Sequence, residues 1–319
     1  MLFELETPRQ YNLLASVHSW IYPDIQPVPE TTGATFFARM YEINDQLVPI
    51  IIEQARPGST VHVKYPSKEV PVESVKAKLS EVLGLTVKMT GALRAIRRSP
   101  QLCRIASQVS GIRPYLSASV YEGLIKTIIQ QQISYRAANA LTRRMVLELS
   151  RKRLFEGLTL YSFPTPAEIL SLGLEGLRSL GLGYKSEYVH RIVELLHDGT
   201  LSLEELKGKS HDEVRATLVP LRGIGPWTVR TLSIAGLGDY TVFPIDDFGV
   251  RNLMGRLYSK NRKRMTTNQV EDIALAWGND WPLVMYLLMC ADVLGYFGEE
   301  GRQQTHKRAS RDDAKRKSG

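Results

Sequence analysis

Two adjacent carboxylates, Asp246 and Asp247, stand at a change of pattern in the chain. Pro244 disfavours a helix before them, whereas the apolar spacing after Asp247 is typical of one. One of the two acids is therefore predicted to be a helix N-cap. A carboxylate in that place faces the positive end of the helix dipole, which favours its ionised form. Such a rigidly held anion can stabilise developing positive charge or orient a water molecule.

A glycine-rich turn precedes these acids by about one helix length. The run 214–221 has helical apolar spacing, Gly223 and Gly225 end it, and Pro226 suits the first turn of a second helix, predicted over 227–237. Amides that no side chain shields, at the start of a helix, can bind a DNA phosphate without reading sequence. A tight turn between two helices with no ligand is the alternative, and these residues alone leave both open.

Two capping-box patterns predict where helices begin in this half of the chain. Ser210 with Glu213 marks the start of the helix before the turn, and Thr165 with Glu168 marks the start of another. From about residue 99 onward, strand signals fade and helical segments dominate.

Four segments resemble, in order and spacing, the helix-hairpin-helix DNA glycosylase superfamily over residues 110–297. They are 121–134, 163–166, 180–185 and the glycine-rich turn with the acids that follow it. The similarity is greatest to enzymes of the 3-methyladenine DNA glycosylase II type, while 180–185 also resembles the 8-oxoguanine glycosylases. The resemblance implies an α+β protein, with a mixed α/β sheet domain followed by an all-α helix-hairpin-helix domain.

The resemblance also implies roles for the acids and for the turn. Asp247 takes the position of the catalytic carboxylate, and Asp246 that of a supporting cap. A shift of one residue in the alignment would exchange the two. The implied contacts of the turn with DNA are Gly223, Ile224, Gly225 and Thr228.

One residue type is missing where related enzymes use it. Enzymes that also cut the strand carry a lysine near the start of the second hairpin helix, and it attacks the sugar. Here that position is Trp227, and no lysine occurs between Leu221 and Asp247. The resemblance therefore implies a monofunctional glycosylase, in which water is the nucleophile and the product is an abasic site.

The enzyme would have to flip the damaged nucleotide out of double-stranded DNA, because its glycosidic bond is otherwise out of reach. The resemblance assigns the wedge that fills the gap to the glutamine-rich loop after Ile129, with Gln132 as the first candidate and Gln131 as the second. Ser134, at the end of this loop, is included among the predicted DNA contacts. A polar junction between two helices is the simpler alternative for these glutamines.

The base pocket is predicted from the same resemblance. Trp227 would stack on a cationic alkylated base, although a core aromatic between helices is the alternative. The remaining predicted lining residues are Thr231, Tyr184, Met289 and Cys290. Thr231 and the Met289–Cys290 pair stand where the alkylation-repair enzymes carry aromatic residues, so the sequence predicts a damaged purine, alkylated first, without fixing which one.

Three alternatives remain open. The chain could act on an oxidised or deaminated purine, or it could be bifunctional with a lysine from elsewhere, for which Lys185 is the candidate. It could also be a DNA-binding protein without catalysis, in which the acids only cap a helix.

Charge and composition fit DNA binding but do not require it. The net charge is +8 over 319 residues, and the segment from Arg302 to the end contributes +5 of it, so the rest of the chain is nearly balanced. Binding should therefore depend on local basic patches, for which 94–98, 143–144 and 260–264 are candidates. An ordinary solvated face is the alternative for each of them.

Two cysteines, Cys103 and Cys290, cannot supply the four ligands of the iron–sulfur cluster that some superfamily members hold. No cofactor is expected, although a monovalent cation at the hairpin is compatible with the resemblance. No signal peptide or long apolar span is visible, so no membrane contact is expected. The protein is predicted to be a monomer in a prokaryotic cytoplasm, associated with the nucleoid.

Three segments are predicted along the chain. Residues 1–98 form an N-terminal α+β domain, with strands in 34–43, 47–52 and 60–65 and a helix over 72–83. Residues 99–300 form an all-helical domain with its hairpin near 210–237, and residues 301–319 form a basic, disordered tail.

Overall fold

The computed structural model describes residues 1–66, 68 and 70–298. Its described residues form two compact units. Unit 1 consists of residues 1–87 and 111–244, and unit 2 of residues 88–110 together with the chain from residue 245. The predicted boundary at residue 98 falls inside unit 2, and the predicted tail 301–319 lies outside the described residues. The functional division into three segments stays a prediction.

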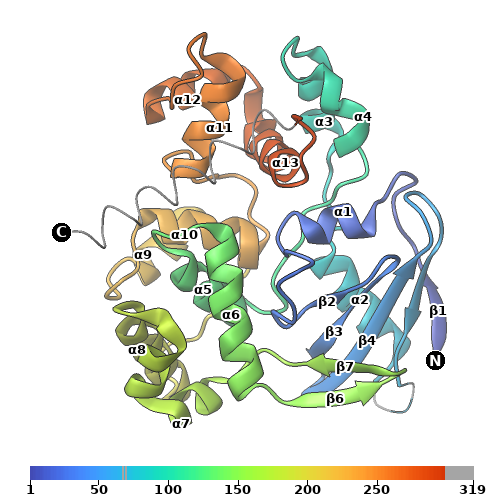
Figure 1. Cartoon of the computed structure of the whole chain (residues 1–319), viewed down its shortest axis with the longest axis vertical. Helices are drawn as coiled ribbons and strands as arrows, with labels where there is room; N and C mark the ends of the chain where they lie inside the picture. Colours follow the sequence, from blue (N-terminus) through green and yellow to red (C-terminus); the bar gives the residue numbers. More distant parts are fainter. Residues whose placement is uncertain (67, 69, 299–319) are drawn as a thin grey trace. The chain divides into compact units, whose positions relative to one another are not determined.

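Unit 1 contains a five-stranded antiparallel sheet (Figure 1). Its order is β1-β5-β4-β3-β2, and the bounds are β1 Leu2–Leu5, β2 Thr31–Thr32, β3 Phe36–Ile43, β4 Gln46–Gln54 and β5 Val61–Lys64. The tight β3–β4 turn is made by Asn44 and Asp45, whose φ angles of 51° and 60° are those that two-residue hairpin turns require. The strands predicted in 34–43, 47–52 and 60–65 are confirmed.

The two faces of this sheet pack against different partners. Alternate residues of β3 and β4, among them Tyr41 and Ile50, pack with the helices α1 (Leu13–His18) and α2 (Val72–Val82). The intervening residues Ala38, Met40 and Ile51 pack with Leu160 of a separate β-hairpin. Successive residues of β3 and β4 therefore pack on opposite faces of the sheet, and both faces are covered at these strands.

This second hairpin was not predicted, because it lies in the segment expected to be helical. Its strands are β6 (Lys152–Phe155) and β7 (Leu158–Tyr161), and its turn is Glu156–Gly157, with φ angles of 50° and 79°. A two-residue turn of this kind selects a hairpin, and the buried Leu160 fixes it to β3 and β4. The packing partners of Leu160 lie about 110 to 120 residues earlier, so no local pattern reveals them.

The rest of unit 1 is helical and has its own apolar core. Its helices are α5 Val120–Gln130, α6 Tyr135–Leu149, α7 Pro166–Leu177, α8 Lys185–His197, α9 His211–Leu218 and α10 Pro226–Leu232, and a π-helical turn, η4, continues α10 over Ser233–Leu237. Both predicted capping boxes, at Thr165 and Ser210, are formed. The α+β class is therefore confirmed, with the β6–β7 hairpin as the one strand element after residue 99 in the described chain.

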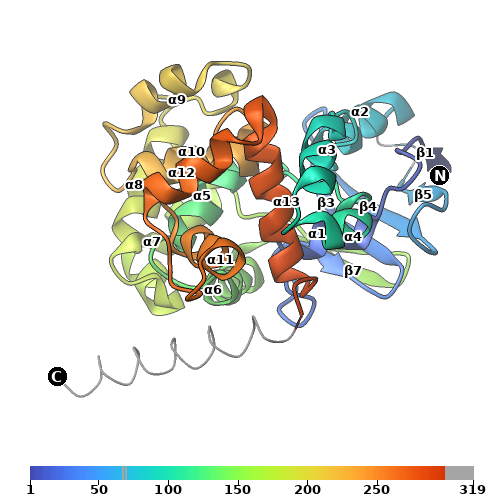
Figure 2. The ribbon, with the colours of Figure 1, turned by 90° about the horizontal axis from the view of Figure 1, so that it is seen from above.

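Unit 2 is built around one buried helix, α13 (Trp281–Val293). The helices α3 (Thr90–Arg98), α4 (Ala106–Val109), α11 (Phe248–Tyr258) and α12 (Thr267–Leu275) all contact it, as Figure 2 shows. The residues of α13 are mostly apolar and buried on all its faces, which is typical of a helix in a core. It has 13 residues, and no helix in the described ranges is long and apolar enough to span a membrane.

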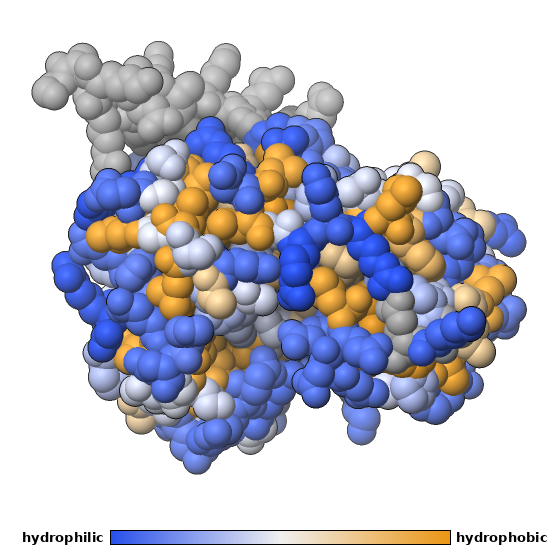
Figure 3. All heavy atoms as spheres, turned by 90° about the horizontal axis from the view of Figure 1, so that it is seen from below, coloured by the Kyte–Doolittle hydropathy of each residue, from blue (hydrophilic) through white to orange (hydrophobic). Residues whose placement is uncertain are grey.

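Apolar side chains are also present on the surface. Leu154 of β6 is 71% exposed and Phe248 at the start of α11 is 63% exposed. Figure 3 shows apolar patches separated by hydrophilic side chains on the face it presents. Scattered exposed apolar residues are normal in folded proteins, so of these two only Phe248, beside the candidate carboxylate, is considered further.

Candidate functional site

The turn between α9 and α10 is held in place by a glycine that packs on an aromatic ring. Gly223 has a φ of 89°, and a Cβ built on it would lie 2.3 Å from Cγ of Tyr188. No other residue type fits there without displacing the ring. Gly225, which caps α10, has an ordinary φ of −108° and no atom within 4 Å of its would-be Cβ. The turn therefore presents an open backbone surface at Gly225.

Two residues of this turn that were predicted to contact DNA are buried and interact with other parts of the protein. The Ile224 side chain is buried in the helical core, and its amide donates to the Leu221 carbonyl at 3.0 Å. Thr228 is buried, and its hydroxyl accepts a hydrogen bond from Gln131. Both residues position the turn, and this leaves Gly225 as its open backbone surface.

Gln131 links the loop after α5 to the same turn. Its Nε2 donates to the Gly223 carbonyl at 2.7 Å and to Thr228 Oγ1 at 3.0 Å. A side-chain amide that bonds two groups of one turn fixes the distance between the two loops. Gln131 is thus directed at the hairpin, where the sequence had it as the second candidate for a wedge.

Gln132, the next residue, makes a different contact. It is exposed and has a φ of 57°, in the left-handed region that residues other than glycine seldom adopt. The Tyr184 hydroxyl donates to its Oε1 at 3.2 Å, and the half-exposed Tyr184 ring meets Tyr188 edge to face at 5.7 Å. Tyr184 therefore stands beside the candidate wedge. Ser134 caps α6, accepting from Ala137 N at 3.2 Å.

Lys185 is buried, with 3% of its surface exposed, and its Nζ donates to the Ile129 carbonyl at 2.6 Å. Burial lowers the pKa of this amine to about 8. A lowered pKa is what a Schiff-base lysine needs. This amine, however, donates its hydrogen bond to a backbone carbonyl near the C-terminus of α5.

The predicted pocket residues of α10 differ in exposure. Trp227 is half-buried, while Thr231 is 4% exposed and its hydroxyl has no hydrogen-bond partner in the described chain. A buried hydroxyl without a partner is costly, so a hydrogen bond from Thr231 to a ligand or a water molecule would be stabilising.

In unit 2, Asp247 is the N-cap of α11. Its Oδ1 accepts hydrogen bonds from the amides of Gly249 at 2.7 Å and Val250 at 3.1 Å. A Cβ at Gly249 would lie 3.1 Å from this oxygen, so the glycine leaves room for the carboxylate. Asp246 lies one residue before the cap. It does not cap α11, so its predicted role as the supporting cap of this helix is wrong. Of the two acids, Asp247 is therefore the N-cap.

Two further side chains lie near this cap, and one of them was not predicted. The Met289 methyl would be 3.8 Å from a Cβ on Gly249, which places this predicted pocket residue close to the cap, whereas Cys290 is buried in the core of unit 2. Phe248 follows Asp247 and carries the Arg264 guanidinium over its ring at 4.6 Å. An exposed aromatic next to a capping acid is the signal that would have identified it.

A buried charge cluster, also missed from the sequence, joins α5 to the sheet of unit 1. Arg39 of β3 bonds Glu122 of α5 at 2.6 Å and Glu30 at 2.9 Å, and Lys126 bonds the same two acids. Burial alone would raise the pKa of Glu122, but Arg39 and Lys126 outweigh it and hold this pKa at about 2. Glu122 is therefore ionised at neutral pH.

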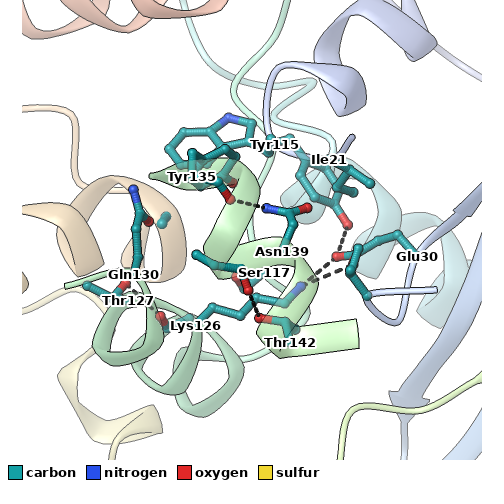
Figure 4. A pocket seen from close by; sticks show the side chains of 15 residues that line it. Ile21, Glu30, Tyr115, Ser117, Lys126, Thr127, Gln130, Tyr135, Asn139 and Thr142 are labelled. Atoms are coloured by element: carbon teal, nitrogen blue, oxygen red, sulfur yellow. Dashed lines mark hydrogen bonds and ion pairs between the residues drawn. The ribbon is translucent and has the colours of Figure 1, made fainter. Parts of the chain in front are cut away.

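A cavity of about 50 Å³ lies beside this cluster, and Figure 4 shows the side chains that line it. Lys126 and Glu30 form one side, and Asn139 of α6 lies opposite. The Asn139 amide donates to the Tyr135 carbonyl at 3.1 Å, while its buried Oδ1 has no hydrogen-bond partner within the described ranges. The volume suits a few water molecules and is too small for a base.

Comparison with known proteins places these features in context. Residues 125–279 match the protein family described as HhH-GPD superfamily base excision DNA repair protein. The chain is 33% identical over 187 residues to a putative DNA-3-methyladenine glycosylase of Bacillus subtilis, and this match covers 58% of the chain and 62% of that relative. It is 27% identical over 258 residues to a DNA-3-methyladenine glycosylase of the same organism, covering 76% and 84%.

The fold is similar to that of a solved 3-methyladenine DNA glycosylase from Archaeoglobus fulgidus. The TM-score is 0.81 at 29% identity, and the similarity covers 93% of this chain and 99% of that one. The likeness thus extends over both units and includes the sheet of unit 1.

Proposed function

We propose that this chain, which belongs to the HhH-GPD superfamily of base excision DNA repair proteins through residues 125–279, is a DNA glycosylase that releases a damaged, alkylated purine. The names of the relatives supply the substrate class. The observation that carries the proposal is Asp247, a carboxylate held by two backbone amides at a helix start. Its substrate is double-stranded DNA with one flipped-out nucleotide.

In this proposal Asp247 stabilises the sugar while the bond from C1′ to the base nitrogen breaks. The bonding electrons leave with the base, whose alkylation makes it a cationic and therefore good leaving group. The sugar gains oxocarbenium character, and the nearby anion offsets its charge. Water then adds to C1′ and loses a proton to solvent or to the carboxylate. The product is an abasic site with an intact phosphate backbone.

We propose that the reaction is monofunctional, with water as the only nucleophile. Trp227 stands at the position where strand-cutting relatives carry a lysine. The Lys185 amine donates a hydrogen bond to the Ile129 carbonyl. Borohydride treatment during the reaction is therefore expected to trap no covalent enzyme–DNA adduct. A trapped adduct that disappears in Lys185→Arg would contradict this, provided that the variant keeps its thermal midpoint.

Gln132 is proposed as the wedge, with Tyr184 beside it. Gln132→Ala is expected to weaken binding to a duplex with a stable abasic analogue by at least about tenfold, and binding to undamaged duplex by less than about threefold, since only the flipped state has a gap to fill. Equal losses on both duplexes, measured by fluorescence anisotropy, would argue against a wedge. Gln131→Ala is the comparison, because its loss loosens the hairpin and should weaken binding to both duplexes.

The two hairpin glycines provide a matched pair of variants. Gly225→Ala adds a methyl group in open space on the proposed phosphate surface, so it should weaken DNA binding about tenfold with a thermal midpoint within a few degrees of the wild type. Gly223→Ala forces a methyl group into the Tyr188 ring at a φ of 89° and should destabilise the fold by about 1–3 kcal/mol. If Gly225→Ala binds DNA like the wild type, the hairpin does not hold the strand there.

The substrate range is tested with duplexes that each carry one lesion: 3-methyladenine, 7-methylguanine, hypoxanthine, ethenoadenine or 8-oxoguanine. Released base is identified before any alkaline treatment, so that base release and strand cutting are separated. We expect release of the methylated purines first. Release of 8-oxoguanine alone would overturn the alkylated class while leaving a glycosylase. The monomeric state, the nucleoid setting and a monovalent cation at the hairpin stay predictions.

A further inference from the structure

Unit 2 contains a groove that the proposed reaction does not use. It has a volume of about 330 Å³ and lies between the outer face of α3 and the segment that precedes α13. This volume is within the range of small-molecule sites. The residues that line it and carry the argument are Gly91, Arg94, Arg98, Ser99, Trp277 and Asp280.

Two arginines on one face of α3 give the groove its positive charge. Arg94 and Arg98 are four residues apart, so their side chains project from the same side of the helix. Both are exposed, and within the described part of the chain neither guanidinium has an ion-pair or hydrogen-bond partner. Guanidinium groups bind phosphate through paired N–H donors. Two of them in one groove are suited to a phosphate group.

The other side chains in the groove are an aromatic ring and an acid. Trp277 is half-buried, and Tyr258 contacts its ring at 6.4 Å, which limits its movement. Asp280 lies against the backbone of α3, where a Cβ on Gly91 would come within 2.0 Å of Oδ2. Gly91 is therefore what admits the carboxylate. Asp280, like the arginines, has no side-chain partner among the described residues.

We propose that this groove binds a nucleotide. Its phosphate is held by Arg94 and Arg98, its base stacks on Trp277, and the N–H groups of the base donate to Asp280. A simple anion would use only the arginines, and a neutral aromatic molecule only the tryptophan. Guanine can present two N–H groups to one carboxylate. A guanine nucleotide can therefore interact with the two arginines, with Trp277 and with Asp280 at the same time. The nucleotide is either free in solution or an unpaired residue of a DNA strand, with the same chemistry in both cases.

Calorimetric titration of the full chain tests this proposal. The ligands are dGMP, dTMP, inorganic phosphate and a short single strand with an unpaired 5′-phosphorylated guanosine. The expected order is dGMP tighter than dTMP by at least about fivefold, with inorganic phosphate weakest. If dGMP does not bind at millimolar concentration but the strand does, and its binding is lost in the variants below, the nucleotide comes from DNA. No saturable binding of dGMP or of the strand overturns the proposal.

Arg97 provides the matched control, because it is an exposed arginine on the same helix that does not line the groove. Arg94→Gln and Arg98→Gln should each raise the Kd at least tenfold, and Arg97→Gln less than twofold. Asp280→Asn should remove the preference for dGMP over dTMP while phosphate binding persists. Equal effects of all three arginine variants, or equal affinity for phosphate and dGMP, would show a diffuse anion contact and overturn a nucleotide site. Base release from a methylated duplex, measured in parallel, separates this outcome from the proposed glycosylase activity.

Discussion

Asp247→Asn is expected to lower the single-turnover rate of base release by at least ~100-fold, which corresponds to about 2.7 kcal/mol of transition-state stabilisation. The variant removes the negative charge that stabilises the developing sugar cation. Asparagine is as good an N-cap as aspartate, and its side-chain oxygen can keep the bonds from Gly249 and Val250. The start of α11 should therefore stay intact, so a loss of rate reports charge and not folding.

Asp246→Asn is the neighbouring control for this prediction. It removes one charge from the same segment but leaves the N-cap in place. We expect its rate to stay within about tenfold of the wild type, and DNA binding by both variants to change little. Near-wild-type base release by Asp247→Asn combined with an inactive Asp246→Asn would transfer the catalytic role to Asp246.

The second large effect is expected at the buried charge cluster of unit 1. Arg39→Met leaves Glu30 and Glu122 buried with Lys126 as their one remaining cation among the described residues. Removing one partner of a buried ionic group costs about 3–5 kcal/mol, because the remaining charge is left uncompensated. Urea unfolding at pH 7 measures this difference. A change below about 1 kcal/mol would mean that the cluster adds little to stability.

The same cluster predicts how stability depends on pH. The pKa of Glu122 is about 2 in the folded protein, below its ordinary 4.5. Its ionised form therefore stabilises the fold at pH values above about 4.5, and this contribution is lost as the pH falls through about 2. In Arg39→Met the carboxyl loses its main favourable partner, so the acid-induced loss of stability should be shallower than in the wild type. Equal slopes between pH 5 and 3 would contradict the assignment to Glu122.

Local chemistry was predictable from the sequence. Both capping boxes, the strands 34–43, 47–52 and 60–65 and the helix after Val72 depend on residues within a few positions of one another. The N-cap of α11 was predictable only as one of two adjacent acids. Which of them caps the helix depends on the residue at which the backbone becomes helical. The Glu156–Gly157 turn carried a hairpin signal, but the strands beside it are held by distant residues.

Long-range contacts account for most of what the sequence did not reveal. Gln131 bonds a turn more than 90 residues away, and Arg39 bonds Glu122 across 83 positions. The family resemblance implied Gln131 as a contact with DNA, and no local pattern around Arg39 indicated a buried ion pair. The groove in unit 2 brings α3 together with Trp277, which lies about 180 residues later. Such pairs depend on tertiary packing, which no local pattern encodes.

The most direct test of the central claim is to identify the products formed from a duplex with a single 7-methylguanine. Mass spectrometry before any alkaline step should find free 7-methylguanine and an uncut strand in which a hydroxyl group replaces the base. Asp247→Asn should produce neither above the spontaneous rate. An uncut strand that keeps its base after prolonged incubation with the wild-type protein, across the methylated purines, would contradict the account and leave a protein that binds DNA without acting on it.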